Sequence, residues 1–180
     1  MDSKIKVKGI KCIVYGVWCM MLLCLPSCTE NKWADWKVQN ELWLAQNLKN
    51  DPTVKVTASG LQYKILADPT PTDAKPSRTS YVTCDYTLTL INGNKLEGGH
   101  ATFALTNVIS GFAEGCCLVH NNGDIRIFIP YSLGYDEAKV TENDEYNAVG
   151  NEGTEGTQSY IPPYSTLIYD IHICSVSGSN

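Results

Sequence analysis

Four cysteines lie in the body of the chain, at Cys84, Cys116, Cys117 and Cys174. A thiol can close a disulfide, bind a metal ion, or pack as a small apolar side chain. Cys116 and Cys117 are adjacent in sequence, and such neighbours rarely bridge each other. The chain has no CxxC pair and no Cys/His spacing typical of zinc sites, so this pattern predicts no metal centre. We interpret the four cysteines as buried free thiols, and a disulfide is the alternative.

Carboxylates are concentrated between residues 136 and 160, a segment with seven acidic residues, one lysine and three glycines. Asp, Glu and Asn side chains can bind calcium, but their spacing here matches no known calcium loop. The segment also lacks an apolar period. We therefore expect a solvated loop and no metal ion.

The overall composition excludes one class of partner. The 180 residues carry 14 basic and 19 acidic side chains, a formal net charge of -5, and the basic residues form no stripe. Because phosphate binding requires clustered Lys and Arg, nucleic acid is not expected as a partner. A hydrophobic content of 43% in a chain of this length is enough for one domain with additional segments.

The first half of the chain predicts a helix followed by strands. Residues 33–49 place Trp and Leu side chains near helical spacing. A short strand is expected at 60–66. Alternating residues predict a longer strand at 81–91, which reaches the turn signal Asn92-Gly93 before a new strand starts at Lys95.

The second half predicts a helix over 107–119, capped by Asn107, and two further strands at 125–129 and about 165–176. Several strands with one short central helix indicate an α+β fold, an antiparallel sheet packed over a helix.

The predicted helix at 33–49 carries three tryptophans, Trp33, Trp36 and Trp43. Two interpretations remain open. The tryptophans could cover apolar surface of the chain's own domain, which we favour, or they could form the face of a homodimer.

The N-terminus has the features of an export signal. Four lysines precede an apolar run from Cys12 to Leu25, which at about 14 residues is short of the ~20 needed to cross a bilayer. The run ends in Leu25-Pro26-Ser27-Cys28, which resembles a bacterial lipobox. We expect residues 1–27 to be removed and Cys28 to be lipidated. Thr29, at the position after Cys28, favours sorting to the outer membrane.

Four short sequence stretches carry the strongest signal in the chain. They read VTCDYT and NGNKLE within 82–97, VISGFAEG at 108–115, GDIRIFIP with LGY within 123–135, and IPPYSTLIYD at 161–170. Together they resemble the FKBP-type peptidyl-prolyl isomerases. A single stretch would be a weak signal, whereas four in the family's order make a chance resemblance improbable.

The resemblance implies an FKBP-like fold, in which a twisted antiparallel β-sheet wraps around one short α-helix, here with an N-terminal helical extension. The implied organisation is a lipoprotein signal peptide at 1–27, a helical segment at 28–57, and an isomerase domain at 58–180 that contains the acidic insertion. No cofactor is implied. The implied partners are proline-containing segments of exported proteins, and the implied location is the bacterial cell envelope.

The resemblance also assigns a site. It implies direct roles at the reacting amide for Tyr86, Glu97, Tyr135 and the backbone N–H of Ile161. It implies an apolar pocket around the prolyl ring with side walls and a floor formed by Leu96, Val108, Ile109, Phe112 and Tyr169.

Three residues depart from the family pattern. Leu96 stands where the family has Phe, Glu97 where it has Asp, and Phe112 where it has Trp. These differences leave open a second interpretation, a non-catalytic FKBP-like peptide-binding module or chaperone. A structural lipoprotein with an inactive pocket is a third.

Overall fold

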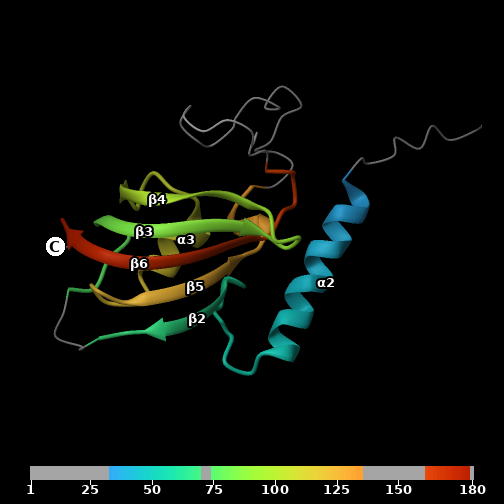
Figure 1. Cartoon of the computed structure of the whole chain (residues 1–180), viewed down its shortest axis with the longest axis horizontal. Helices are drawn as coiled ribbons and strands as arrows, with labels where there is room; N and C mark the ends of the chain where they lie inside the picture. The colour runs from blue at the N-terminus through green and yellow to red at the C-terminus, as the bar shows by residue number, and fades with distance from the viewer. Residues whose placement is uncertain (1–32, 70–73, 136–160, 179–180) are drawn as a thin grey trace, which may run out of the picture. The chain divides into compact units, whose positions relative to one another are not determined.

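The computed structural model describes residues 33–69, 74–135 and 161–178. In this part of the chain, six strands form one antiparallel sheet in the order β1-β2-β5-β6-β3-β4 (Figure 1). The strands are β1 (Lys55–Val56), β2 (Gln62–Ala67), β3 (Tyr81–Leu90), β4 (Lys95–Ala104), β5 (Asp124–Ile129) and β6 (Leu167–Ser177). The helices are α2 (Ala34–Asn50), α3 (Ser110–Cys116) and the 3-10 turn η1 (Tyr131–Leu133). The α+β architecture predicted from the sequence is confirmed.

Alternation along the central strands separates a core face from an outer face of the sheet. In β6, Leu167, Tyr169, Ile171 and Ile173 are buried, while the residues between them are half-buried. Successive side chains of a strand point to opposite faces. The core face therefore carries the apolar residues of β6, and the outer face carries Asp170, His172 and Cys174.

Helix α3 packs on the core face against β5 and lies behind the sheet in Figure 1. Phe112, Ala113 and Cys116 of this helix are buried together with Ile125, Ile127 and Ile129 of the strand in one apolar core. This is the arrangement expected from the sequence, a sheet covering one short helix.

The close approach of α3 to β5 depends on Gly115. A Cβ atom added at this glycine would lie 2.7 Å from Cδ1 and 2.8 Å from Cγ2 of Ile127. Alanine in place of glycine normally stabilises a helix by about 1 kcal/mol, whereas overpacking a core costs about 1–3 kcal/mol. We expect Gly115→Ala to lower the free energy of unfolding by up to about 2 kcal/mol in urea denaturation.

The control is Gly99→Ala, because a Cβ atom at Gly99 would meet no atom within 4 Å. That substitution should leave the unfolding midpoint unchanged or raise it. Equal midpoints for the two variants would contradict the tight helix–strand packing.

The predicted helix at 107–119 is too long at both ends, since α3 spans only Ser110–Cys116. Asn107 does not cap it: its backbone N–H donates to the carbonyl of Ala104 at 2.9 Å, and its side chain accepts from Thr106. Ile109 is extended, with φ -58° and ψ 146°, and the helix begins only at Ser110. The two apolar residues before the helix therefore lie in a turn that packs against the core.

Helix α2 packs against one end of the sheet, as its contacts show. The Trp43 and Phe128 rings lie 5.7 Å apart, and the Trp36 indole N–H donates to Ser165 Oγ at 3.0 Å. The fully buried Asn40 accepts a hydrogen bond from the backbone N–H of Thr166 at 2.7 Å. Two of the three tryptophans thus cover the domain's own surface, as favoured from the sequence.

No helix among the described residues is long and apolar enough to cross a membrane. The apolar run at 12–25, the lipidation site Cys28 and the acidic insertion at 136–160 lie outside the described residues.

The expectation of buried free thiols holds for only two cysteines. All four are free, but Cys117 and Cys174 are half-buried, whereas Cys84 and Cys116 are buried. Cys174 points to the outer face of β6, which the sheet register decides and the sequence alone could not.

Candidate active site

Four aromatic rings from four different elements meet on the core face of the sheet. They are Tyr86 of β3, Phe103 of β4, Phe112 of α3 and Tyr169 of β6, and we refer to them as the aromatic cluster. The Phe112 centroid lies 5.1 Å from that of Tyr169 and 5.3 Å from that of Phe103, both edge-on. Tyr86 contacts Phe103 edge-on at 5.3 Å and Tyr169 at 6.3 Å. Edge-to-face pairs at these distances are favourable, so the cluster forms a packed aromatic wall.

A bulge in β4 places one apolar and one polar side chain, Leu96 and Glu97, beside this wall. Leu88 of β3 pairs with Glu97, but the next residue, Thr89, pairs with Lys95, which leaves Leu96 as the extra residue. An extra residue interrupts the alternation of faces and re-aims a side chain. Leu96 accordingly packs against the core, although its neighbour Glu97 also lies at the site.

Glu97 provides a carboxyl group in this apolar setting. Burial raises the pKa of Glu97, and a hydrogen bond from the Tyr86 hydroxyl partly opposes that rise. Tyr86 lies opposite Gly99, two residues beyond Glu97 along β4, so the two side chains are diagonal neighbours on one face.

The tyrosines around Glu97 remain protonated over a wide pH range. Burial, followed by the charge of Glu97, raises the pKa of Tyr86, Tyr135 and Tyr169. Each hydroxyl is therefore a hydrogen-bond donor at neutral pH.

The raised pKa of Glu97 has a testable consequence for stability. The fold favours the neutral carboxyl group, so this contribution is complete below the unfolded pKa and is lost as pH rises through the folded pKa. Glutamine mimics the neutral form and still accepts from Tyr86. We expect Glu97→Gln to raise the unfolding midpoint relative to the unsubstituted chain at about pH 8 and to change it little at about pH 4.

The matched control is Glu41→Gln, whose side chain lies on the exposed side of α2. A Glu97→Gln effect of the same size at both pH values would show that burial of the charged carboxylate does not destabilise the fold.

The remaining residues predicted for the site come from the loops around the cluster. Val108, Ile109 and Tyr135 are half-buried and pack against the core, whereas Ile161 is buried within it. The Tyr164 backbone N–H donates to the carbonyl of Tyr135 at 3.3 Å, which ties the segment before β6 to the end of η1. Ring contacts, the bond to Tyr86 and the charge of Glu97 link five of the nine predicted residues: Tyr86, Glu97, Phe112, Tyr135 and Tyr169. The other four, Leu96, Val108, Ile109 and Ile161, lie in or against the same apolar core.

Phe103 is a member of the aromatic cluster that sequence reasoning missed. It contacts both Tyr86 and Phe112, and it lies six residues after Glu97 on the same face of β4. The alternation of β4 could have indicated it, because positions 97, 99, 101 and 103 share a face.

A model of the family described as FKBP-type peptidyl-prolyl cis-trans isomerase matches residues 72–174, which include all nine predicted site residues. The chain belongs to this family. The resemblance drawn from the four sequence stretches is therefore confirmed.

Two relatives illustrate the similarity in sequence. A protein of Neisseria meningitidis serogroup B, named probable FKBP-type peptidyl-prolyl cis-trans isomerase FkpA, is 32% identical over 79% of this chain and 47% of its own length. A Legionella longbeachae protein named outer membrane protein MIP is 33% identical over 78% of this chain and 54% of its own length. The chain spans about half the length of these curated relatives.

Solved structures support the fold. The crystal structure of FkpA from Escherichia coli superposes with a TM-score of 0.64 at 23% identity, covering 97% of this chain and 75% of that chain. A peptidyl-prolyl cis-trans isomerase from Pseudomonas syringae superposes with a TM-score of 0.66 at 22% identity, covering 83% of this chain and 99% of that chain.

Proposed function

We propose that this chain is a peptidyl-prolyl cis-trans isomerase that assists the folding of exported proteins. The observation that carries the proposal is the aromatic cluster with Glu97 and Tyr135 beside it, within the segment that matches the family model. Such a site requires no cofactor and no covalent step. The barrier of ~18–20 kcal/mol arises from the partial double bond of the X-Pro amide, and the site lowers it by binding the twisted amide better than either planar form.

We propose that the prolyl ring packs on Phe112 as the floor of an apolar pocket. The walls would be formed by Tyr86, Leu96, Val108, Ile109 and Tyr169. An apolar surface that removes water from the amide favours the twisted state, because that state is less polar than the planar amide. Each tenfold gain in rate needs only about 1.4 kcal/mol, so a few contacts are enough.

Polar groups at the edge of the pocket would orient the peptide. The Tyr135 hydroxyl donates to one substrate carbonyl, since its raised pKa keeps it protonated. The Ile161 backbone N–H donates to a second carbonyl, and the Glu97 carboxyl group lies near the reacting amide. Glu97 is one methylene longer than the family's Asp, so we expect its position relative to the amide to differ.

We propose that the acidic insertion at 136–160 affects which peptides reach the pocket. It follows Tyr135 directly, at Asp136, where the family has a Gly. The family resemblance implies that this segment borders the site, so we propose that its seven carboxylates disfavour acidic peptides. We propose that the domain extends over 58–180 and includes this insertion, with a helical segment at 28–57.

The isomerase proposal is tested by NMR exchange between the cis and trans signals of a short X-Pro peptide in the presence of the full chain. Faster exchange than in buffer supports an enzyme. Peptide binding without faster exchange would overturn the proposal and support the non-catalytic binding module, which the substitutions at Leu96 and Glu97 favour.

We further propose a lipid-anchored location in the bacterial cell envelope, on the outer membrane. The support is the lipobox-like sequence ending at Cys28 and the similarity to a relative named as an outer membrane protein. Mass spectrometry of the membrane fraction should find Cys28 as an acylated N-terminal residue. A mature chain that starts elsewhere, or a Cys28→Ala variant that still fractionates with membranes, would contradict the anchor.

A homodimer through α2 is a separate proposal. Val38, Leu42 and Leu48 are exposed on this helix, with 52%, 55% and 36% of their surface accessible. We expect light scattering to give twice the chain mass and Leu42→Lys to give the monomer mass. The monomer mass for the unsubstituted chain would contradict the pairing.

A further inference from the structure

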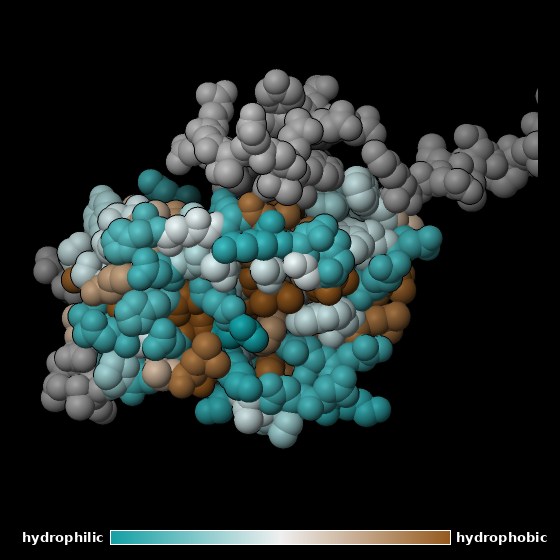
Figure 2. Space-filling model, viewed as in Figure 1, coloured by the Kyte–Doolittle hydropathy of each residue, from teal (hydrophilic) through white to brown (hydrophobic). Residues whose placement is uncertain are grey.

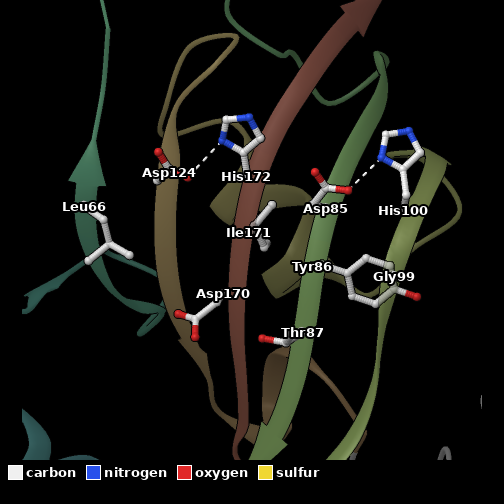
Figure 3. Close-up of a pocket in the computed structure, with 10 residues that line it drawn as sticks. All are labelled: Leu66, Asp85, Tyr86, Thr87, Gly99, His100, Asp124, Asp170, Ile171 and His172. Carbon is white, nitrogen blue, oxygen red and sulfur yellow. Dashed lines mark hydrogen bonds and ion pairs between the residues drawn. The ribbon is translucent and has the colours of Figure 1, made fainter.

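The outer face of the sheet, away from the aromatic cluster, carries a row of alternating carboxylates and imidazoles. Asp124 of β5 pairs in register with His172 of β6, His172 with Asp85 of β3, and Asp85 with His100 of β4. The four side chains therefore cross four adjacent strands side by side, as Figure 3 shows. Two of the three histidines in the chain lie in this row.

Short contacts connect the members of the row. The Nδ1–H of His100 donates to Asp85 at 2.7 Å, and that of His172 donates to Asp124 at 2.9 Å (Figure 3). The Cys174 thiol donates to the second oxygen of Asp85 at 3.5 Å. Asp85 thus has an imidazole at one oxygen and a thiol at the other.

We propose that Asp85, His100 and Cys174 form a binding site for a zinc-type transition metal ion. One ligand atom from each residue lies within 4.8 Å of the others. Around a tetrahedral zinc ion with ligands at about 2.0–2.3 Å, ligand atoms lie roughly 3.3–3.7 Å apart. Small side-chain rotations that open the His100–Asp85 hydrogen bond would therefore admit the ion, with water completing the coordination.

The ligand types select the ion. A thiolate and an imidazole favour zinc and its neighbours, whereas magnesium and calcium prefer sites made of oxygen ligands alone. A carboxylate as third ligand is common at zinc sites and lowers the net charge of the bound complex.

The surroundings are open to the solvent and rich in carboxylates. The row lines a groove of about 510 Å³ that also includes Asp170 and Thr87. The charge of Asp170 is engaged by Arg126, whose Nη2 donates to it at 2.7 Å. Much of this face is hydrophilic in Figure 2, so an aqueous cation can approach the groove.

The site is separate from the proposed catalytic pocket. Asp85 and Tyr86 are consecutive in β3 and point to opposite faces, so the metal would lie on one side of the sheet and the prolyl peptide on the other. Spacing along the chain does not reveal this site, because its ligands are separated by 15 and 74 residues and meet only through the sheet register.

Alkylation of Cys174 in the full chain tests the site directly. A metal-bound thiolate is withheld from the reagent. One equivalent of Zn²⁺ that fills about nine-tenths of the sites should therefore lower the rate of Cys174 labelling by iodoacetamide about tenfold. Quantitative peptide mass spectrometry reports each cysteine separately. Chelation by EDTA should restore the labelling rate.

Cys117 is the internal control in the same chain. It is also half-buried, but its charged neighbours are Arg78, Lys75 and Glu114, which do not form a metal site. Zn²⁺ should leave its labelling unchanged.

Substitutions complete the test. His100→Ala and Asp85→Asn should each abolish most of the protection of Cys174. His120→Ala should preserve it, because His120 bonds to Asp68 and not to any of the three proposed ligands. Unprotected Cys174 at one equivalent of Zn²⁺, or protection that survives both ligand substitutions, would overturn the proposal.

Discussion

Replacing Phe112 by alanine is expected to lower the free energy of unfolding by about 3–5 kcal/mol. Phe112 is 4% exposed, and its ring packs edge-on against both Phe103 and Tyr169. Alanine removes the centre of the aromatic cluster and leaves a cavity among rings from two strands. Urea denaturation measures the loss.

Leucine at the same position separates stability from activity. Phe112→Leu retains most of the buried volume, so the domain should remain folded, but the flat floor proposed for the prolyl ring is lost. We expect kcat/KM for X-Pro isomerisation to fall about tenfold, the loss of about 1.4 kcal/mol of binding to the twisted amide. Phe128→Leu is the matched control, because Phe128 is equally buried but contacts Trp43 of α2 instead.

Equal losses of activity in the two leucine variants would indicate that general destabilisation, and not the floor of the pocket, controls the rate. Retained activity in Phe112→Leu would place the prolyl ring elsewhere.

Replacing Asn40 by alanine is expected to cost about 2–3 kcal/mol of stability. Asn40 is fully buried, and its side chain accepts from the backbone N–H of Thr166 at 2.7 Å and donates to the Trp36 carbonyl at 2.8 Å. Alanine leaves the Thr166 N–H buried without this partner. The same change removes one of the hydrogen bonds between α2 and the segment that joins Ile161 to β6, and leaves the bond from Trp36 to Ser165. We therefore also expect weaker peptide binding.

The control for this variant is Gln39→Ala, one residue earlier on the exposed side of α2. This substitution raises helix propensity less than Asn40→Ala does. It removes no buried hydrogen bond, and stability should change by less than about 0.5 kcal/mol. A small effect of Asn40→Ala would show that α2 docks mainly through its tryptophans.

The fold was predictable because its local signals agree with one another. The turn signal Asn92-Gly93 lies between β3 and β4, where Gly93 adopts a positive φ of 83°. The alternation of β6 marks its core face. The four family-like sequence stretches, in their order along the chain, indicate how the strands and the helix are connected. The start of α3 was not predictable. Asn is a favoured N-cap residue, but Asn107 instead forms a turn with Ala104, which depends on where β4 ends.

The site residues that could be predicted are those that single sequence positions identify. Tyr86, Phe112 and Tyr169 stand at positions that the family resemblance assigns to the pocket, and the structure brings them together. The orientation of Leu96 depends on a bulge, and the row from Asp124 to His100 depends on the register of four strands. Register is a property of paired strands, so neither feature is visible in one linear sequence.

The most direct test of the isomerase site compares two tyrosines near η1 in a peptide isomerisation assay of the full chain. Tyr135 lies at the proposed pocket, whereas the hydroxyl of Tyr131 donates to Glu41 of α2 at 3.1 Å. We predict that the chain accelerates X-Pro isomerisation, that Tyr135→Phe lowers kcat/KM about tenfold, and that Tyr131→Phe stays within about twofold. A folded chain that gives no acceleration over buffer, or equal rates for the two variants, would contradict this account.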